Sequence, residues 1–165
     1  MHYPVVEMDR PDLDTAVDIR AGAHSDYGSL TLLFQRASQP GLEILTPNSS
    51  WSPVSVHPPG TEHDSFPPIL VNIGDLMQFW TNGLLNSTVH RVVFPEGESK
   101  DRYSIAYFCH PLDHIEIEAV PSDMIRDRKT ENMQQRAEKV TAEGYLKKRL
   151  ADTYGWGKQQ SPARD

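Results

Sequence analysis

Residues 22–33 read GAHSDYGSLTLL, and this stretch indicates how the fold is built. Residues 30–33, LTLL, are apolar and partly β-branched, which is typical of a strand entering a core. His24 and Asp26 stand two positions apart just before it. Residues i and i+2 of a strand point to the same face, so the spacing predicts that an imidazole and a carboxylate converge at the mouth of a buried strand. A surface turn can carry the same pair, so the pattern needs support from other segments.

Short apolar runs alternate with turn signals as far as residue 110. The expected strands cover 39–45, 51–56, both halves of 69–80, 87–94 and 102–110, with turns at 47–50 and 81–83 and a proline-rich loop at 57–68. Many short strands at this spacing favour a β-sandwich or barrel.

The end of the chain has a different pattern. Residues 141–154 place apolar side chains at helical spacing, with Thr141 as a plausible N-cap and Gly155 as a stop signal. The basic run KKR at 147–149 is expected on a solvated helix face. Residues 156–165 are expected to be a disordered tail.

Composition narrows the class of protein. The chain has 165 residues, 38% hydrophobic content, a formal net charge of −7 and a single cysteine, Cys109. An acidic protein lacks the field that grips a phosphate backbone, so no nucleic-acid partner is expected. One cysteine cannot form an internal disulfide, and no secretory signal or membrane-spanning run is visible. The expectation is a soluble cytoplasmic protein that uses no membrane.

His90, in the run STVHRVVF (87–94), is a second candidate ligand. On a strand it shares a face with Thr88, Val92 and Phe94, which is otherwise an apolar surface. Two interpretations fit such a residue: a hydrogen-bonded core histidine or a metal ligand.

The run RYSIAYFC at 102–109 contributes an arginine and a hydroxyl. Period-two alternation puts Arg102, Ser104, Ala106 and Phe108 on one face and Tyr103, Ile105 and Tyr107 on the other. A guanidinium beside a hydroxyl suits a carboxylate ligand. The alternative is an arginine at the strand edge, paired with Asp101 or Glu98.

The combination is more specific than its parts. Two histidines and one carboxylate form the facial triad of non-haem Fe(II) oxygenases, which leaves coordination positions open. An Arg/Ser pair on a later strand would hold the far carboxylate of a chelating co-substrate. The ligand set alone would also suit a zinc hydrolase, but the Arg/Ser pair argues against one.

The order of motifs resembles the 2-oxoglutarate and Fe(II)-dependent oxygenases of the isopenicillin N synthase-like group. The matching text is HSDYGSLTLLFQ, VNIGD, STVHRVVFP and RYSIAYFCHP, and it covers roughly residues 1–112. The resemblance implies a mostly β fold, a double-stranded β-helix (a cupin-like jelly roll) followed by a C-terminal α-helix.

The resemblance also implies roles for individual residues. His24, Asp26 and His90 would bind Fe(II), while Arg102, Ser104 and Tyr3 would bind 2-oxoglutarate. Tyr27, Phe108 and His110 are candidates for the substrate pocket, although plain packing explains each equally well. Asn72, Gly74 and Asp75, and residues 80–83, are interpreted as framework turns.

The implied activity is the oxidation of a small organic substrate, by hydroxylation or desaturation, with 2-oxoglutarate and O₂ converted to succinate and CO₂. Two alternatives remain: a same-fold oxidase that does not use 2-oxoglutarate, and a non-catalytic metal-binding remnant. The expected domains are a jelly roll at 1–120, a helical extension at 121–155 and the tail. Relatives begin well before the HYP strand at 2–4, so the chain is expected to lack their N-terminal region. Surface left bare in this way invites self-association.

Overall fold

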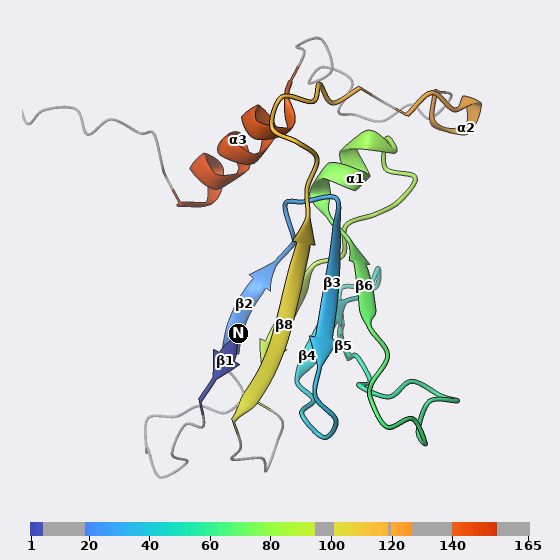
Figure 1. The fold of residues 1–165 in the computed structure, drawn as a ribbon, viewed down its shortest axis with the longest axis vertical. Coiled ribbons are helices and arrows are strands. Elements are labelled where there is room, and N and C mark those ends of the chain that lie inside the picture. The colour runs from blue at the N-terminus through green and yellow to red at the C-terminus, as the bar shows by residue number, and fades with distance from the viewer. Residues whose placement is uncertain (5–18, 95–100, 119, 127–139, 155–165) are drawn as a thin grey trace, which may run out of the picture.

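The computed structural model describes residues 1–4, 19–94, 101–118, 120–126 and 140–154. They form eight strands and three helices, and the helices gather at one end of the strands (Figure 1). The elements are β1 (His2–Tyr3), β2 (Ile19–His24), β3 (Leu30–Gln35), β4 (Leu42–Leu45), β5 (Trp51–Pro53), β6 (Leu70–Ile73), α1 (Asp75–Trp80), β7 (His90–Val93), β8 (Arg102–Cys109), α2 (Asp123–Arg126) and α3 (Ala142–Tyr154).

The described strands make two four-stranded antiparallel sheets. One sheet has the order β1-β8-β3-β6 and the other β2-β7-β4-β5. Apart from the hairpin of β4 and β5, neighbours in each sheet are distant in sequence, because the chain crosses from one sheet to the other. Two four-stranded sheets connected in this way are a jelly roll, so the predicted fold class is confirmed.

The core between the sheets follows the alternation of the strands. In β3, Thr31 and Leu33 are buried, while Phe34 is exposed. Leu33 packs in one cluster with Leu42 of β4 and Val92 of β7. Each sheet therefore has one apolar face turned toward the other sheet, as period-two patterning predicts.

A second, smaller core lies at the helical end. Leu76 of α1, Ile117 and Ala142 of α3 are buried together. The predicted helix at 141–154 is confirmed as α3, and the Thr141 hydroxyl accepts a hydrogen bond from the Gly144 N–H at 3.2 Å, as an N-cap does. The predicted stop at Gly155 and the tail at 156–165 lie outside the described residues.

The expected second strand of residues 69–80 is wrong. After β6 the chain turns at Gly74 and forms helix α1. The Asp75 and Leu76 N–H groups bond the carbonyl oxygens of Asp26 and Gly28, at 2.7 and 3.1 Å. This docking starts a helix that a six-residue apolar run cannot reveal, because such runs fit either structure.

Residues 22–33 also differ from a single continuous strand. β2 ends at His24 and β3 begins at Leu30, so Asp26 lies in the connection between strands of different sheets. The two side chains converge because a strand end meets a turn, and not because they alternate along one strand. A further correction concerns the run at 147–149, since Arg149 is partly buried and pairs with Asp75.

No helix within the described ranges is long and apolar enough to cross a membrane. The division of the chain at residue 120 stays a prediction, and residues 127–139 of the expected helical extension lie outside the described residues.

Candidate metal and co-substrate site

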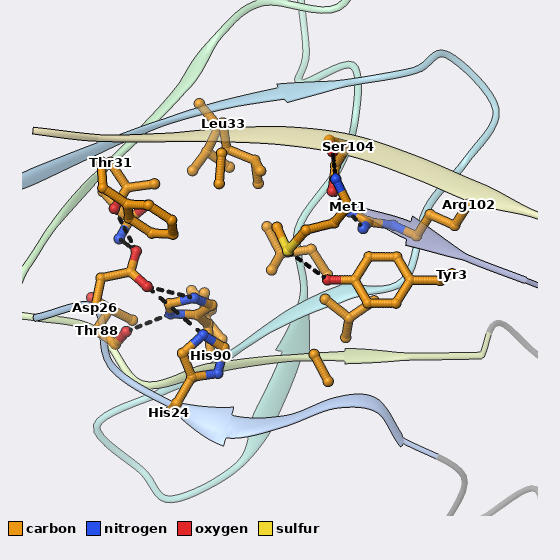
Figure 2. Close-up of a pocket in the computed structure, with 18 residues that line it drawn as sticks. Met1, Tyr3, His24, Asp26, Thr31, Leu33, Thr88, His90, Arg102 and Ser104 are labelled. Atoms are coloured by element: carbon orange, nitrogen blue, oxygen red, sulfur yellow. Dashed lines mark hydrogen bonds and ion pairs between the residues drawn. The ribbon is translucent and has the colours of Figure 1, made fainter. Parts of the chain in front are cut away.

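Two histidines and one aspartate meet where β2 ends and its neighbour β7 begins. His24 ends β2 and His90 begins β7, and the two are register partners in that sheet with ring centroids 4.4 Å apart. Asp26 follows in the β2–β3 connection, and only 7% of it is exposed. Its Oδ1 lies 3.7 Å from the Nε2 of each histidine. Figure 2 shows the three side chains pointing toward one another.

Both imidazole rings are oriented by the backbone. The Nδ1 of His24 lies 2.7 Å from the Gly22 carbonyl oxygen, and the Nδ1 of His90 lies 3.0 Å from that of Thr88. A carbonyl oxygen only accepts, so each Nδ1 carries the hydrogen and donates it. Each Nε2 then keeps its lone pair for a ligand bond, the arrangement usual for metal-binding histidines.

The second oxygen of Asp26 is hydrogen-bonded inside the protein. Its Oδ2 accepts from the Thr31 hydroxyl at 2.5 Å and from the Asn72 side-chain amide at 2.8 Å. Neither role was predicted from the sequence, since Thr31 stands in an apolar strand pattern and Asn72 was interpreted as a turn residue. The available signal was that each polar side chain falls on the inward face of its strand.

The connection that carries Asp26 is fixed by close backbone packing. A Cβ on Gly74 would lie 2.2 Å from the Gly28 carbonyl oxygen, so a larger residue does not fit there. The Ser25 hydroxyl donates to the Asp75 carboxylate at 3.0 Å. Arg149 of α3 bonds the same carboxylate, at 2.5 Å. Helices α1 and α3 together therefore hold the turn in place.

A guanidinium and a hydroxyl lie at the other end of the space between the sheets. Arg102 is 2% exposed and donates to Ser104 Oγ at 3.3 Å, to Gln35 Oε1 at 3.2 Å and to the Pro40 carbonyl oxygen at 3.1 Å. Tyr3, paired with Arg102 across β1 and β8, directs its hydroxyl toward the sulfur of Met1.

One cavity of about 280 Å³ joins the two groups. Apolar side chains of both sheets form most of its wall. Figure 2 shows the triad at one end and Arg102, Ser104 and Tyr3 at the other. The lining residues are Met1, Tyr3, Ala21, His24, Asp26, Thr31, Leu33, Leu42, Ile44, Leu70, Asn72, Thr88, His90, Val92, Arg102, Ser104, Ala106 and Phe108.

The three candidate substrate residues are placed differently. Phe108 lines the cavity and is 58% exposed, so it lies where the cavity meets solvent. Tyr27 and His110 do not belong to the lining formed by the described residues. The Tyr27 hydroxyl donates to Thr153 of α3 at 2.6 Å. The Nδ1 of His110 lies 2.9 Å from the Pro111 carbonyl oxygen.

The donor set fits an octahedral Fe(II) ion. Among the described residues His24, Asp26 and His90 form the one cluster able to hold a metal, with donor atoms within 4.8 Å of one another. Neighbouring donors around an octahedral ion bound at about 2.1 Å stand about 3 Å apart, so these three donors would move closer together to take adjacent positions on one ion. Two imidazoles and one carboxylate with open positions define the class of non-haem iron oxygenase sites.

Comparison with known sequences identifies the family. Residues 2–111 match the 2OG-Fe(II) oxygenase superfamily. The proline hydroxylase buaE of Petromyces alliaceus is 38% identical over 159 residues, covering 93% of this chain and 45% of the relative. The 2-oxoglutarate-dependent dioxygenase htyE of Aspergillus rugulosus is 34% identical over 162 residues, covering 94% and 45%. This chain belongs to the 2OG-Fe(II) oxygenase superfamily.

Solved structures agree with that assignment. A full-length Neurospora crassa protein, solved in complex with alpha-KG and thymine, has a TM-score of 0.71 and 39% identity, covering 93% of this chain and 43% of that chain. The chain thus spans less than half the length of each of these relatives.

Proposed function

We propose that this chain carries the catalytic site of a 2-oxoglutarate- and Fe(II)-dependent dioxygenase that oxidises a small organic molecule. One observation carries the proposal. A single cavity has an Asp/His/His donor set at one end and a buried Arg/Ser pair at the other. A co-substrate that chelates a metal with one end and presents a carboxylate at the other matches this arrangement.

At the metal end, His24, Asp26 and His90 are the proposed ligands. Iron bound there supplies the chemistry that consumes O₂ and 2-oxoglutarate, with succinate and CO₂ as the proposed products. The protein contributes position and environment. The Nδ1 bonds orient both imidazoles, and apolar side chains that include Leu33 and Val92 form the wall between the two ends of the cavity.

At the other end, Arg102 and Ser104 are proposed to bind the distal carboxylate of 2-oxoglutarate. The guanidinium offers a two-pronged set of donors with a permanent positive charge, and the Ser104 hydroxyl lies beside it. Tyr3 is proposed as a third donor. Its hydroxyl now donates to a sulfur atom, which is a weak acceptor that a carboxylate readily replaces.

The substrate is proposed to approach past Phe108, where the cavity opens. One relative is named as a proline hydroxylase, and another was solved with thymine. Proline and thymine are both small polar molecules. A small organic substrate is therefore proposed here too. Tyr27 and His110 lie outside the lining, so they remain weaker candidates for substrate contact.

The test starts with an anaerobic Fe(II) titration. Adding 2-oxoglutarate to the iron-loaded wild-type chain should produce a metal-to-ligand charge-transfer band, and O₂ with a suitable substrate should release succinate. His90→Ala should lose the band and the succinate, because two donors hold the metal poorly. His57→Ala is the matched control, since its ring bonds the Thr61 carbonyl in a loop outside the cavity lining.

The possible failures are distinct. Iron-dependent succinate release by His90→Ala would contradict the ligand assignment. Iron binding without oxygen consumption would indicate a non-catalytic metal-binding domain. Turnover of a substrate without succinate would indicate an oxidase of the same fold.

A further inference from the structure

The two carboxylate oxygens of Asp26 have different surroundings. Oδ1 faces the two histidines and lies 3.7 Å from each Nε2. Oδ2 faces away from them and accepts the two hydrogen bonds from Thr31 and Asn72. Oδ1 is therefore available to bind a metal ion, while Oδ2 is already hydrogen-bonded to the protein.

The two donors are held by the sheet itself. Thr31 of β3 and Asn72 of β6 are cross-strand partners, so both side chains lie side by side on the inward face. Thr31 is 3% exposed. Strand pairing fixes the spacing of the two donors before any ligand binds. Thr31 and Asn72, which we call the clamp, are therefore part of the framework of the sheet.

We propose that Thr31 and Asn72 are positioning residues that keep Asp26 a one-oxygen ligand. The inference rests on the proposed iron site and adds to it the reason for its open positions.

A carboxylate with both oxygens free can chelate a metal and fill two coordination positions. Together with the two histidines, such a carboxylate would fill four of the six coordination positions of the metal, and only two positions would remain open. A co-substrate that chelates through two oxygens would then leave no position for O₂. With Oδ2 retained by the protein, three positions stay open.

Cobalt(II) provides a readout that does not depend on activity, because its visible absorption changes with the set of coordinated atoms and their geometry. The variants are Thr31→Val and Asn72→Leu, which remove one donor each at nearly constant volume, and their combination. Thr81→Val is the matched control: it removes another buried hydroxyl, which donates to the Met77 carbonyl in the turn after α1. Thr31→Ser keeps the hydroxyl that Thr31→Val removes, and it tests whether the hydroxyl alone is enough for binding like that of the wild type.

We expect each single variant to weaken Co(II) binding by about 10-fold to 100-fold, the usual effect of losing a hydrogen bond to a ligand. The double variant should also show an altered visible spectrum, because the second carboxylate oxygen would replace a coordinated water. Thr81→Val should lower the melting temperature without changing affinity or spectrum, and Thr31→Ser should bind like the wild type.

Two results would overturn the inference, and they are separable. If the wild type binds Co(II) and the double variant binds with the same affinity and spectrum, the clamp has no role and the metal site stands. If the wild type binds no Co(II), the proposed iron site fails and the clamp with it.

Discussion

At the scale of single residues, the structure separates the metal end of the cavity from its charged end. Arg102 is enclosed at the beginning of β8, and its bonds to Ser104, Gln35 and Pro40 hold the guanidinium in one orientation. An oriented guanidinium binds a carboxylate with little further loss of side-chain entropy. The residue should therefore act on co-substrate affinity and leave metal affinity alone.

Arg102→Ala tests this separation. A hydrogen bond to a charged group contributes about 1.5–3 kcal/mol, so the concentration of 2-oxoglutarate needed for half-maximal binding should rise about 10-fold to 100-fold. Affinity for Fe(II) alone should stay within a few-fold of the wild type. Titration of the iron-loaded protein with 2-oxoglutarate measures the first quantity.

Arg91→Ala is the control for that substitution. Arg91 pairs with Glu43 and stacks on Trp51, and it does not belong to the cavity lining. It should leave 2-oxoglutarate binding unchanged. An unchanged requirement for 2-oxoglutarate in Arg102→Ala would remove the proposed role of the guanidinium.

Residues that touch the cavity directly were easier to predict than those that act through a neighbour. The inward face of β8 follows from alternation alone, and the structure puts Arg102, Ser104 and Phe108 on the cavity wall as expected. The role of Asn72 depends on a partner 46 positions away in sequence. No local pattern reports such a pairing, because strand register is decided by the whole sheet.

At the scale of elements, helices α1 and α3 form a second packing unit beside the sheets. Tyr145 of α3 packs against Phe79 of α1 with ring centroids 5.8 Å apart. Burial raises the pKa of Tyr145 to about 12, the charge of Asp75 adds to the rise, and Arg149 opposes it. The phenol therefore stays neutral in the folded protein over a pH range in which an unfolded chain ionises.

This difference predicts how stability depends on pH. Tyrosine in an unfolded chain ionises near pH 10, while Tyr145 in the folded chain holds its proton to about pH 12. The unfolded state therefore loses the proton first, and the free energy of unfolding should fall as pH rises from about 10 to 12. Tyr145→Phe should flatten this fall, as measured by urea denaturation at several pH values.

Tyr154→Phe provides the comparison, since Tyr154 is an exposed tyrosine on the same helix. Its pH profile should match that of the wild type. A profile of Tyr145→Phe with an undiminished fall above pH 10 would show that other groups cause the loss.

Elements also differed in how well their type could be predicted. The strands of alternating pattern and the capped helix at 142–154 were predicted from their own residues. Helix α1 was not, because its first N–H groups bond carbonyl oxygens of the β2–β3 connection. Its helical state depends on contacts that are remote in sequence.

At the scale of the whole molecule, the outward face of one sheet exposes several large apolar side chains. Ile105 and Tyr107 of β8 are 66% and 60% exposed, Phe34 of β3 is the register partner of Ile105, and Val71 of β6 follows one strand further. Exposed apolar surface that spans three neighbouring strands is typical of an interface.

We expect the isolated chain to associate through this face. Sedimentation velocity of the wild type should show species larger than the monomer of 18.6 kDa, increasing with concentration. Ile105→Lys combined with Tyr107→Glu should shift the distribution to monomer, because charges on the face oppose its burial.

Met124→Lys is the control, since Met124 is equally exposed on α2. It should leave the distribution unchanged. A wild type that sediments as a monomer at all concentrations would contradict the expected association.

The tie between α3 and the Asp26 turn has a consequence for how the protein is made. Arg149 reaches back 74 positions to Asp75, and Thr153 reaches back 126 positions to Tyr27. A ribosome releases the metal ligands long before it releases this helix. During synthesis the nascent chain therefore carries all three proposed ligands while the turn that holds Asp26 is not yet braced. The proposed site should therefore reach full metal affinity only after α3 has emerged and docked, so the centre matures later than its ligands are made.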